Sequence, residues 1–204
     1  MPADVNVVFV DIDTQRDFLD PDGALFIAGS TAIRPELARL TKIAHERRIP
    51  VVASACAHQP EDFEIEPFPP HCVVGSKGQE RIPETARPGS FVIDPDRTIA
   101  PTSRTFDHVT INKRYYDLFS NKSADALFAA LGDFETTFYV YGVATDYCVK
   151  AAVEGLLARG RKVAVVVDAI RAVDSTAEPA ILTEFVRLGA ILTITSVVET
   201  SLCK

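Results

Sequence analysis

The chain has 204 residues, of which 47% are hydrophobic, and this is enough apolar material for one globular domain with a sizeable core. Its 28 acidic residues outnumber 21 Lys and Arg, so the formal net charge is −7, which argues against nucleic acid and anionic membranes as partners. Four cysteines, with no signal-like or long apolar segment, lead us to expect a cytoplasmic protein with reduced thiols.

Strand-like and helix-like segments alternate along the chain. Apolar, β-branched runs predict strands over residues 6–10, 51–53, 109–112, 137–143, 162–167 and 191–195. Apolar residues at helical spacing predict helices over residues 31–48, 123–131, 146–159 and 176–188. Pro50 stops the first helix, and Gly160 and Gly189 are suited to cap the last two. We interpret the Pro-rich, weakly periodic segment 59–101 as a long excursion over one edge of the sheet.

The predicted strands lack in-and-out alternation, which is typical of strands buried on both faces. Helices between such strands favour right-handed crossovers. We therefore expect an α/β fold, a single domain over residues 1–204, with a doubly wound, Rossmann-like, mostly parallel sheet of about six strands. Ligands of such sheets bind beyond the carboxyl ends of the strands. In this chain those positions are residues 11–18, 54–58, 113–116 and 144–148.

Cys148 lies where a predicted strand turns into a helix, so its sulfur would feel the positive end of the helix dipole. That effect is worth about 0.3–1 kcal/mol, which is less than one pKa unit. An ammonium about 4 Å away contributes about 4 kcal/mol, or roughly three pKa units, so a nearby lysine would dominate. Lys113, directly after a predicted strand, is the candidate. Backbone N–H groups around Ala144 and Cys148 are candidates for binding the oxygen of a tetrahedral intermediate.

Each of these residues also has a structural interpretation. Cys148 is equally compatible with a small apolar residue on the buried side of a helix. Lys113 taken alone is compatible with an ordinary solvated lysine, and the acidic stretch 11–17 with a solvated turn that caps a helix.

Four segments, in this order along the chain, resemble the motifs of the isochorismatase-like cysteine hydrolases, and of nicotinamidases in particular. They are DTQRDF at 13–18, PPHC at 69–72, Lys113, and GVATDYC at 142–148. The resemblance covers nearly the whole chain, and the first and last segments are fairly specific as an ordered pair.

The resemblance implies an amidohydrolase that converts nicotinamide, or a similar small aromatic amide, to the acid and ammonia through a thioester, as in NAD salvage. It implies Asp13 as general base and acid, Cys148 as nucleophile and Lys113 as the cation that supports the thiolate. It further implies an oxyanion-binding turn at Val143 and Ala144, and walls for a flat ring at Phe18 and Phe68. Asp11 is the alternative carboxylate, and only the spacing to the rest of the motif favours Asp13.

Nicotinamidases usually carry an Asp-x-His metal motif where this chain has Cys56 and His58. Residues two apart on an extended segment point the same way, so Cys56 and His58 are predicted to share a divalent ion with His71, and the soft thiolate ligand favours zinc. A further ligand remains open among Asp62, Glu64 and Glu66. The alternative is an inert buried thiol with two hydrogen-bonded imidazoles and no metal.

Two other functions remain compatible with the sequence. One is a related cysteine hydrolase for another small amide, ureide or carbamoyl compound, which the replacement of the expected acid by Cys56 favours. The other is a catalytically silent protein on the same scaffold. Cys148 argues against isochorismatase proper. We expect a small-molecule amide as the substrate and a homo-oligomer as the assembly.

Overall fold

The fold was analysed in a computed structural model that describes residues 6–62, 68–99 and 107–202. Its centre is a seven-stranded sheet of parallel strands in the order β3-β4-β2-β1-β5-β6-β7. The strands are β1 Val7–Ile12, β2 Val51–Cys56, β3 Phe91–Ile93, β4 His108–Lys113, β5 Thr137–Val143, β6 Lys162–Arg171 and β7 Ile191–Thr193. The predicted doubly wound parallel sheet is confirmed.

The predicted count of about six strands is wrong by one, because β3 forms within the Pro-rich excursion. Its three residues are too few for a periodic signal, and they pair with β4 at the edge of the sheet.

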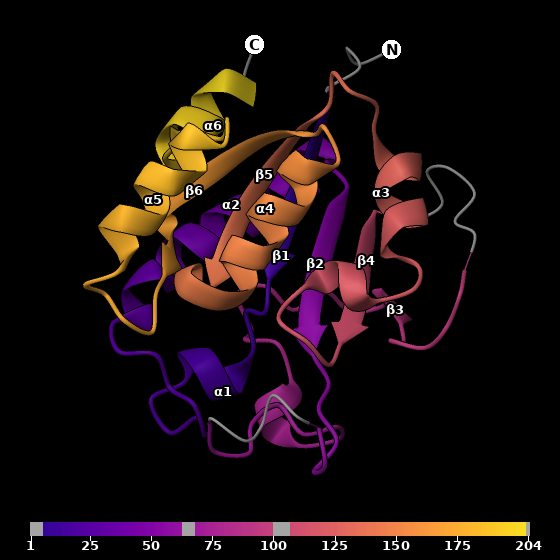
Figure 1. The fold of residues 1–204 in the computed structure, drawn as a ribbon, viewed down its shortest axis with the longest axis vertical. Coiled ribbons are helices and arrows are strands. Elements are labelled where there is room, and N and C mark those ends of the chain that lie inside the picture. The colour runs from indigo at the N-terminus through magenta and orange to yellow at the C-terminus, as the bar shows by residue number, and fades with distance from the viewer. Residues whose placement is uncertain (1–5, 63–67, 100–106, 203–204) are drawn as a thin grey trace.

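Helices cover both faces of the sheet (Figure 1), with α4 crossing in front of the strands and α2 lying behind them. The helices are α1 Arg16–Leu19, α2 Arg34–Arg47, α3 Ala124–Leu131, α4 Lys150–Ala158, α5 Glu178–Arg187 and α6 Thr195–Leu202. The short α1 and the last helix, α6, were not predicted, and α6 packs against α2. Within residues 6–62, 68–99 and 107–202, no helix is both long and apolar enough to cross a membrane.

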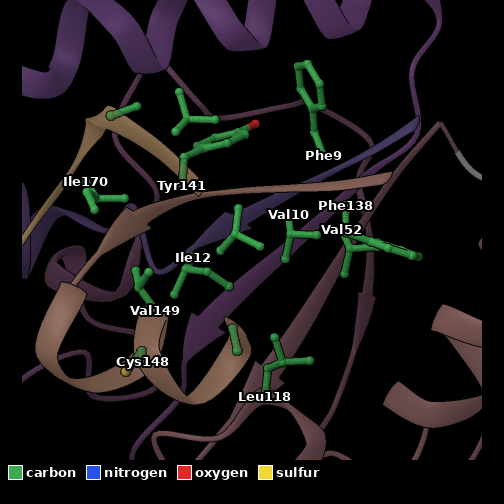
Figure 2. Packing of buried hydrophobic residues seen from close by; sticks show 14 of the residues in the cluster. Phe9, Val10, Ile12, Val52, Leu118, Phe138, Tyr141, Cys148, Val149 and Ile170 are labelled. Atoms are coloured by element: carbon green, nitrogen blue, oxygen red, sulfur yellow. The ribbon is translucent and has the colours of Figure 1, made fainter. Parts of the chain in front are cut away.

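The core lies on both sides of the central strands (Figure 2). Phe9 and Tyr141 point to one side, where their rings meet edge to face at 5.9 Å, and Val10 and Ile12 point to the other. All four side chains are at most 1% exposed. β1 is therefore buried on both faces, which explains its continuous apolar run.

Several strands run further than predicted: β2 extends to Cys56 instead of residue 53, and β6 to Arg171 instead of residue 167. β1 continues through Asp11 to Ile12, and β4 includes Lys113 as its last residue. Polar residues usually mark the end of a buried strand, but here each has a charged partner inside the protein: Arg81 for Asp11 and Asp13 for Lys113.

The topology leaves a crevice beyond the carboxyl end of β1. The chain passes from β1 to β2 on one side of it, and after β4 it crosses to β5 on the other side, so the strand order reverses next to β1. Ligands of open α/β sheets bind at such a switch point. The segments that follow β1, β2, β4 and β5 all begin at this edge of the sheet.

Candidate active site

Four side chains meet at the carboxyl edge of the sheet. Asp13 follows β1, and Cys148 lies in the turn after β5. Cys56 and Lys113 are the last residues of β2 and β4, and they face each other in register. The Lys113 Nζ lies 2.8 Å from the Asp13 Oδ2. It also donates hydrogen bonds to the sulfurs of Cys56 at 3.1 Å and Cys148 at 3.4 Å. The structure thus brings the predicted trio together and adds a second thiol.

Asp13, and not Asp11, is the carboxylate at the lysine. Asp13 has a backbone φ of 47°, in the left-handed region, which breaks the alternation of β1. Ser54 holds it there, since its carbonyl oxygen accepts the Asp13 N–H at 3.2 Å and its Oγ donates to Oδ1 at 2.7 Å. Asp11 instead accepts hydrogen bonds from Arg81 and Thr14. Its carboxylate therefore belongs to a separate buried network.

Asp13 and Lys113 form a fully buried ion pair, with both side chains 0% exposed. Burial alone would raise the pKa of Asp13, but the attraction and hydrogen bond of Lys113 outweigh it and lower that pKa. Burial would likewise lower the pKa of Lys113, but the Asp13 carboxylate and the two nearby sulfurs raise it well above its ordinary value. The resting centre at neutral pH is therefore a carboxylate and an ammonium.

Cys148 remains a protonated thiol in this resting arrangement. A hydrogen bond with Cys56 and burial raise the pKa of Cys148 well above its ordinary value, and the attraction of Lys113 does not offset them. The prediction that Lys113 would dominate this pKa is wrong, because it left out the desolvation of the sulfur and the Asp13 charge that already balances the ammonium. The Cys148 sulfur lies within 4.8 Å of the Asp13 carboxylate, and the Cys56 thiol donates to the Asp13 Oδ2 at 3.6 Å, so both thiol protons are close to that carboxylate.

The turn that carries the nucleophile candidate connects β5 to α4. It is a single π-helical turn, Thr145–Val149, in which the Val149 N–H donates to the Ala144 oxygen at 3.0 Å. The Val143–Ala144 peptide bond before it is cis. Figure 2 shows Cys148 and Val149 in this turn, below the side chain of Ile12. Cys148 therefore sits at the N-terminal end of a helical segment, where backbone N–H groups are suited to an anionic oxygen.

Two residues of the 13–18 segment anchor distant backbone, one at the end of β2 and one in the loop that carries His71. The Gln15 side-chain amide donates to the Cys56 oxygen at 2.9 Å and accepts from the Cys56 N–H at 2.8 Å. Asp17 accepts the Cys72 N–H at 2.6 Å, which ties down the loop that carries His71. Sequence reasoning did not assign these roles, because each depends on a backbone group far away in the chain.

A pocket lined mainly by apolar and aromatic side chains opens above the two thiols. The residues that line it are Phe18, Leu25, Ile27, Cys56, His58, Phe68, His71, Tyr116, Ala144, Tyr147, Cys148 and Val173. Of the four residues predicted to contact substrate, Phe18, Phe68 and Ala144 line the pocket. Val143 does not line it and is 0% exposed. Tyr116 and Tyr147 were missed, because aromatic residues in loops carry no distinctive spacing.

The pocket is narrow, with a cavity volume of about 30 Å³. That is room for about two water molecules. Its aromatic walls touch one another: the rings of Phe68 and Tyr147 are 5.4 Å apart, and those of Tyr116 and Tyr147 are 5.2 Å apart. Phe68 and Tyr147 are only partly buried, so a flat ring would enter by displacing them.

The two histidines predicted to bind metal lie side by side, whereas the Cys56 sulfur is at hydrogen-bond distance from Lys113. The rings of His58 and His71 are 4.9 Å apart, and Nδ1 of His58 is buried without a hydrogen-bond partner. That nitrogen lies 3.7 Å from the Asp62 carboxylate. Two imidazoles and a carboxylate are ligand types that zinc accepts, but the ligand atoms of His58, His71 and Asp62 do not all lie within 4.8 Å of one another, so these side chains would have to move to hold an ion. Cys56 instead accepts the hydrogen bond of Lys113.

Among the described residues, Cys56, His58 and His71 do not form a set of mutually close ligand atoms. Cys56 is the last residue of β2. His58 lies beyond the strand, and its backbone N–H donates a hydrogen bond to the Cys72 backbone oxygen. Glu64 and Glu66, the other candidate ligands, lie outside the described residues.

One set of potential ligand atoms does lie mutually within 4.8 Å, and it consists of Asp13, Cys56 and Cys148. It is a poor site for a resident cation, because the Lys113 ammonium already contacts all three ligand atoms at 2.8–3.4 Å. A metal ion there would face a positive charge at contact distance in a buried environment. We therefore interpret this set as a centre for proton transfer and thiol chemistry.

Comparison with known proteins gives one family match. The family model described as the isochorismatase domain matches residues 7–196. No curated protein matches the sequence.

Several solved structures share the fold over almost their whole length. A zinc-bound pyrazinamidase of Pyrococcus horikoshii has 25% identity and a TM-score of 0.75, with 93% of this chain and 99% of that chain covered. An N-carbamoylsarcosine amidase of Thermoplasma acidophilum has 21% identity and a TM-score of 0.75, with 93% and 96% covered. A nicotinamidase of Bacillus subtilis has 19% identity and a TM-score of 0.76, with 92% and 99% covered.

Proposed function

The chain belongs to the isochorismatase family of hydrolases, and on that premise we propose that it is a cysteine-dependent amidohydrolase of a small aromatic amide such as nicotinamide. The observation that carries the proposal is the contact among Asp13, Lys113 and Cys148 beneath an apolar pocket. A proton acceptor, a cation and a thiol in contact are the parts that acyl transfer from an amide requires.

The reaction begins with movement of a proton from Cys148 to Asp13. Because the thiol pKa is raised and the carboxyl pKa is lowered, the thiolate is a minor species at rest. Once Asp13 is protonated and neutral, Lys113 has lost its carboxylate partner, and its ammonium stabilises the new thiolate. The proton transfer therefore accompanies attack on a bound substrate.

The sulfur of Cys148 then adds to the amide carbon. Negative charge develops on the carbonyl oxygen, and backbone N–H groups at the turn around Ala144 and Cys148 are placed to receive it. Asp13 returns its proton to the departing nitrogen, ammonia leaves, and an acyl thioester remains. Water activated by the Asp13 carboxylate hydrolyses the thioester and restores the thiol.

The pocket lining favours a neutral aromatic substrate. Within the described residues, no arginine or lysine is among the lining residues, and Lys113 beneath the pocket is already paired with Asp13. A substrate carboxylate would be desolvated there without a partner cation, which is costly. A flat uncharged ring would instead stack against Phe18, Phe68 and Tyr147.

A second candidate is a hydrolase of a smaller ureide or carbamoyl compound. The narrowness of the pocket supports it, since a volume of about 30 Å³ admits such a compound with less displacement of Phe68 and Tyr147 than an aromatic ring needs.

We also propose that His58 and His71 hold a divalent ion, with Asp62 as the carboxylate beside them. When bound, such an ion would offer an open coordination position to a ring nitrogen of the substrate or to a water molecule. Elemental analysis of the purified protein tests this: about one ion per chain, lost in His71→Ala, is expected. A chain that carries no ion after incubation with zinc would contradict it.

Ammonia release over a panel of amides tests the activity itself. We expect the fastest release from nicotinamide and pyrazinamide, none in Cys148→Ala, and normal release in Cys72→Ala, whose buried thiol lies outside the site. Release only from ureides or carbamoyl compounds would favour the second candidate. A folded wild-type protein that releases ammonia from none of them would exclude both.

A further inference from the structure

The active centre contains one thiol more than hydrolysis uses. Cys148 serves as the nucleophile, yet Cys56 lies at the same ammonium, and their sulfurs lie within 4.8 Å of each other and of the Asp13 carboxylate. Both are free cysteines. The other described cysteine, Cys72, is separate from them, and its sulfur lies 3.9 Å from the Gly78 oxygen.

The two thiols can be reached by a small oxidant. Both line the same pocket, and its volume of about 30 Å³ admits a molecule the size of hydrogen peroxide without displacing a wall. Both thiols are buried and protonated at rest, so the reactive thiolate has to form in the pocket: Asp13 can take up a thiol proton, and Lys113 can stabilise the thiolate next to it.

We propose that Cys56 and Cys148 are a reversible oxidation site, in which hydrogen peroxide converts the two thiols into an intramolecular disulfide. The Cys148 thiolate attacks one peroxide oxygen and the O–O bond breaks. This leaves Cys148 as a sulfenic acid, and the hydroxide released becomes water on gaining the proton from Asp13. Cys56 then gives its proton to Asp13 and attacks the sulfenic sulfur, forming the S–S bond and releasing hydroxide, which takes that proton. In sum, two thiols and one peroxide give one disulfide and two waters.

The required movement is confined to one side of the pair. A disulfide needs its sulfurs about 2.05 Å apart. The backbone of Cys56 is fixed by strand pairing with Lys113 and by the two hydrogen bonds of Gln15. Cys148 lies in a π-helical turn, so rotation of its side chain and a local change of that turn supply the approach.

The disulfide would switch hydrolysis off while protecting the nucleophile. A sulfur in a disulfide cannot attack an amide, and it is also shielded from irreversible oxidation to sulfinic and sulfonic acids. Exchange with a dithiol such as dithiothreitol would break the bond and restore both thiols. This consequence for turnover rests on the proposed function, whereas formation of the bond does not.

Thiol mapping of the full chain tests the proposal without any substrate. The reduced protein is treated with hydrogen peroxide, remaining thiols are alkylated, and intact mass and non-reduced peptides are analysed. We expect a mass about 2 Da below the reduced form before alkylation, and a peptide pair linked through Cys56 and Cys148 that dithiothreitol removes. Because the readout is a mass, it stands even if no amide is hydrolysed.

Two matched variants sharpen the test. Cys72→Ser, which alters a buried thiol outside the pair, is expected to form the same linked peptides. Cys56→Ser is expected to carry sulfinic or sulfonic acid at Cys148, which dithiothreitol does not reverse. The proposal is overturned if wild-type Cys148 reaches sulfinic acid while Cys56 stays reduced, or if the linked peptides contain another cysteine. The wild-type map decides even if Cys56→Ser does not fold.

Discussion

Replacing Lys113 by methionine tests how the buried ion pair holds the active centre together. Methionine keeps most of the side-chain length but removes the ammonium, which leaves the Asp13 carboxylate buried with only the Ser54 hydroxyl and the thiols around it. Loss of one partner of a buried pair costs about 3–5 kcal/mol. In a domain of this size 1 kcal/mol shifts the melting temperature by about 2–4 °C, so we expect a fall of about 6–20 °C.

The pH dependence of this loss has a definite sign. In the wild type, the lowered pKa of Asp13 contributes stability that is fully present above the ordinary value of 3.8 and is lost as the pH falls through the folded value. Without Lys113, burial is left as the main influence and raises that pKa above the ordinary value. The variant is therefore expected to be closest to wild type in acid and to lose stability as the pH rises through the raised pKa.

Denaturant unfolding at pH 5 and pH 7 measures both effects. The control is the double variant Asp13→Asn with Lys113→Met, which leaves no unpaired charge and is expected to recover part of the lost free energy of unfolding. The reasoning would be refuted if Lys113→Met unfolded within about 1 kcal/mol of wild type, the range of an exposed pair, with no pH dependence and no recovery in the double variant.

Three further variants test the surroundings of the site. Gly142→Ala would place a Cβ 2.0 Å from the Ile12 oxygen, so we expect a larger loss of melting temperature than in Gly189→Ala, which shares the positive φ but has open space; equal losses would contradict this. Tyr147→Ala removes a pocket wall and is expected to raise the KM for nicotinamide several-fold at a similar kcat, whereas an unchanged KM would remove the ring from substrate binding. Gln15→Ala frees the Cys56 backbone and is expected to lower kcat about tenfold in a folded protein; full kcat would mean that this anchor is dispensable.

The order of elements and the fold were readable from the sequence because buried parallel strands are long apolar runs. Residues 137–143 were predicted with the observed bounds. The carboxyl ends of β1, β2, β4 and β6 were predicted too short. Asp11 and Lys113 look like solvent-facing residues until their buried partners are known. Three-residue β3 carries too little pattern to be found.

The proximity of Asp13, Lys113 and Cys148 followed from topology, because all three lie at or just beyond the carboxyl ends of strands that share one edge. The place of Cys56 did not follow. Alternation along an extended segment predicted that it would face the same way as His58, but β2 ends at Cys56, whose sulfur accepts the hydrogen bond of Lys113, and His58 lies beyond the strand in an isolated bridge with Val73. The direction of the Cys148 pKa shift was also unreadable, because it depends on burial and on a neighbour 92 positions away in the sequence.

The central claim is that Cys148 attacks the substrate with help from Asp13 and Lys113. Rapid acid quench of the wild-type enzyme with nicotinamide, followed by intact-mass and peptide analysis, tests it most directly. We expect an acyl group on Cys148 that hydroxylamine removes, and neither adduct nor ammonia in folded Cys148→Ala. Ammonia released by Cys148→Ala at the wild-type rate, or an acyl group on another residue, would contradict the account.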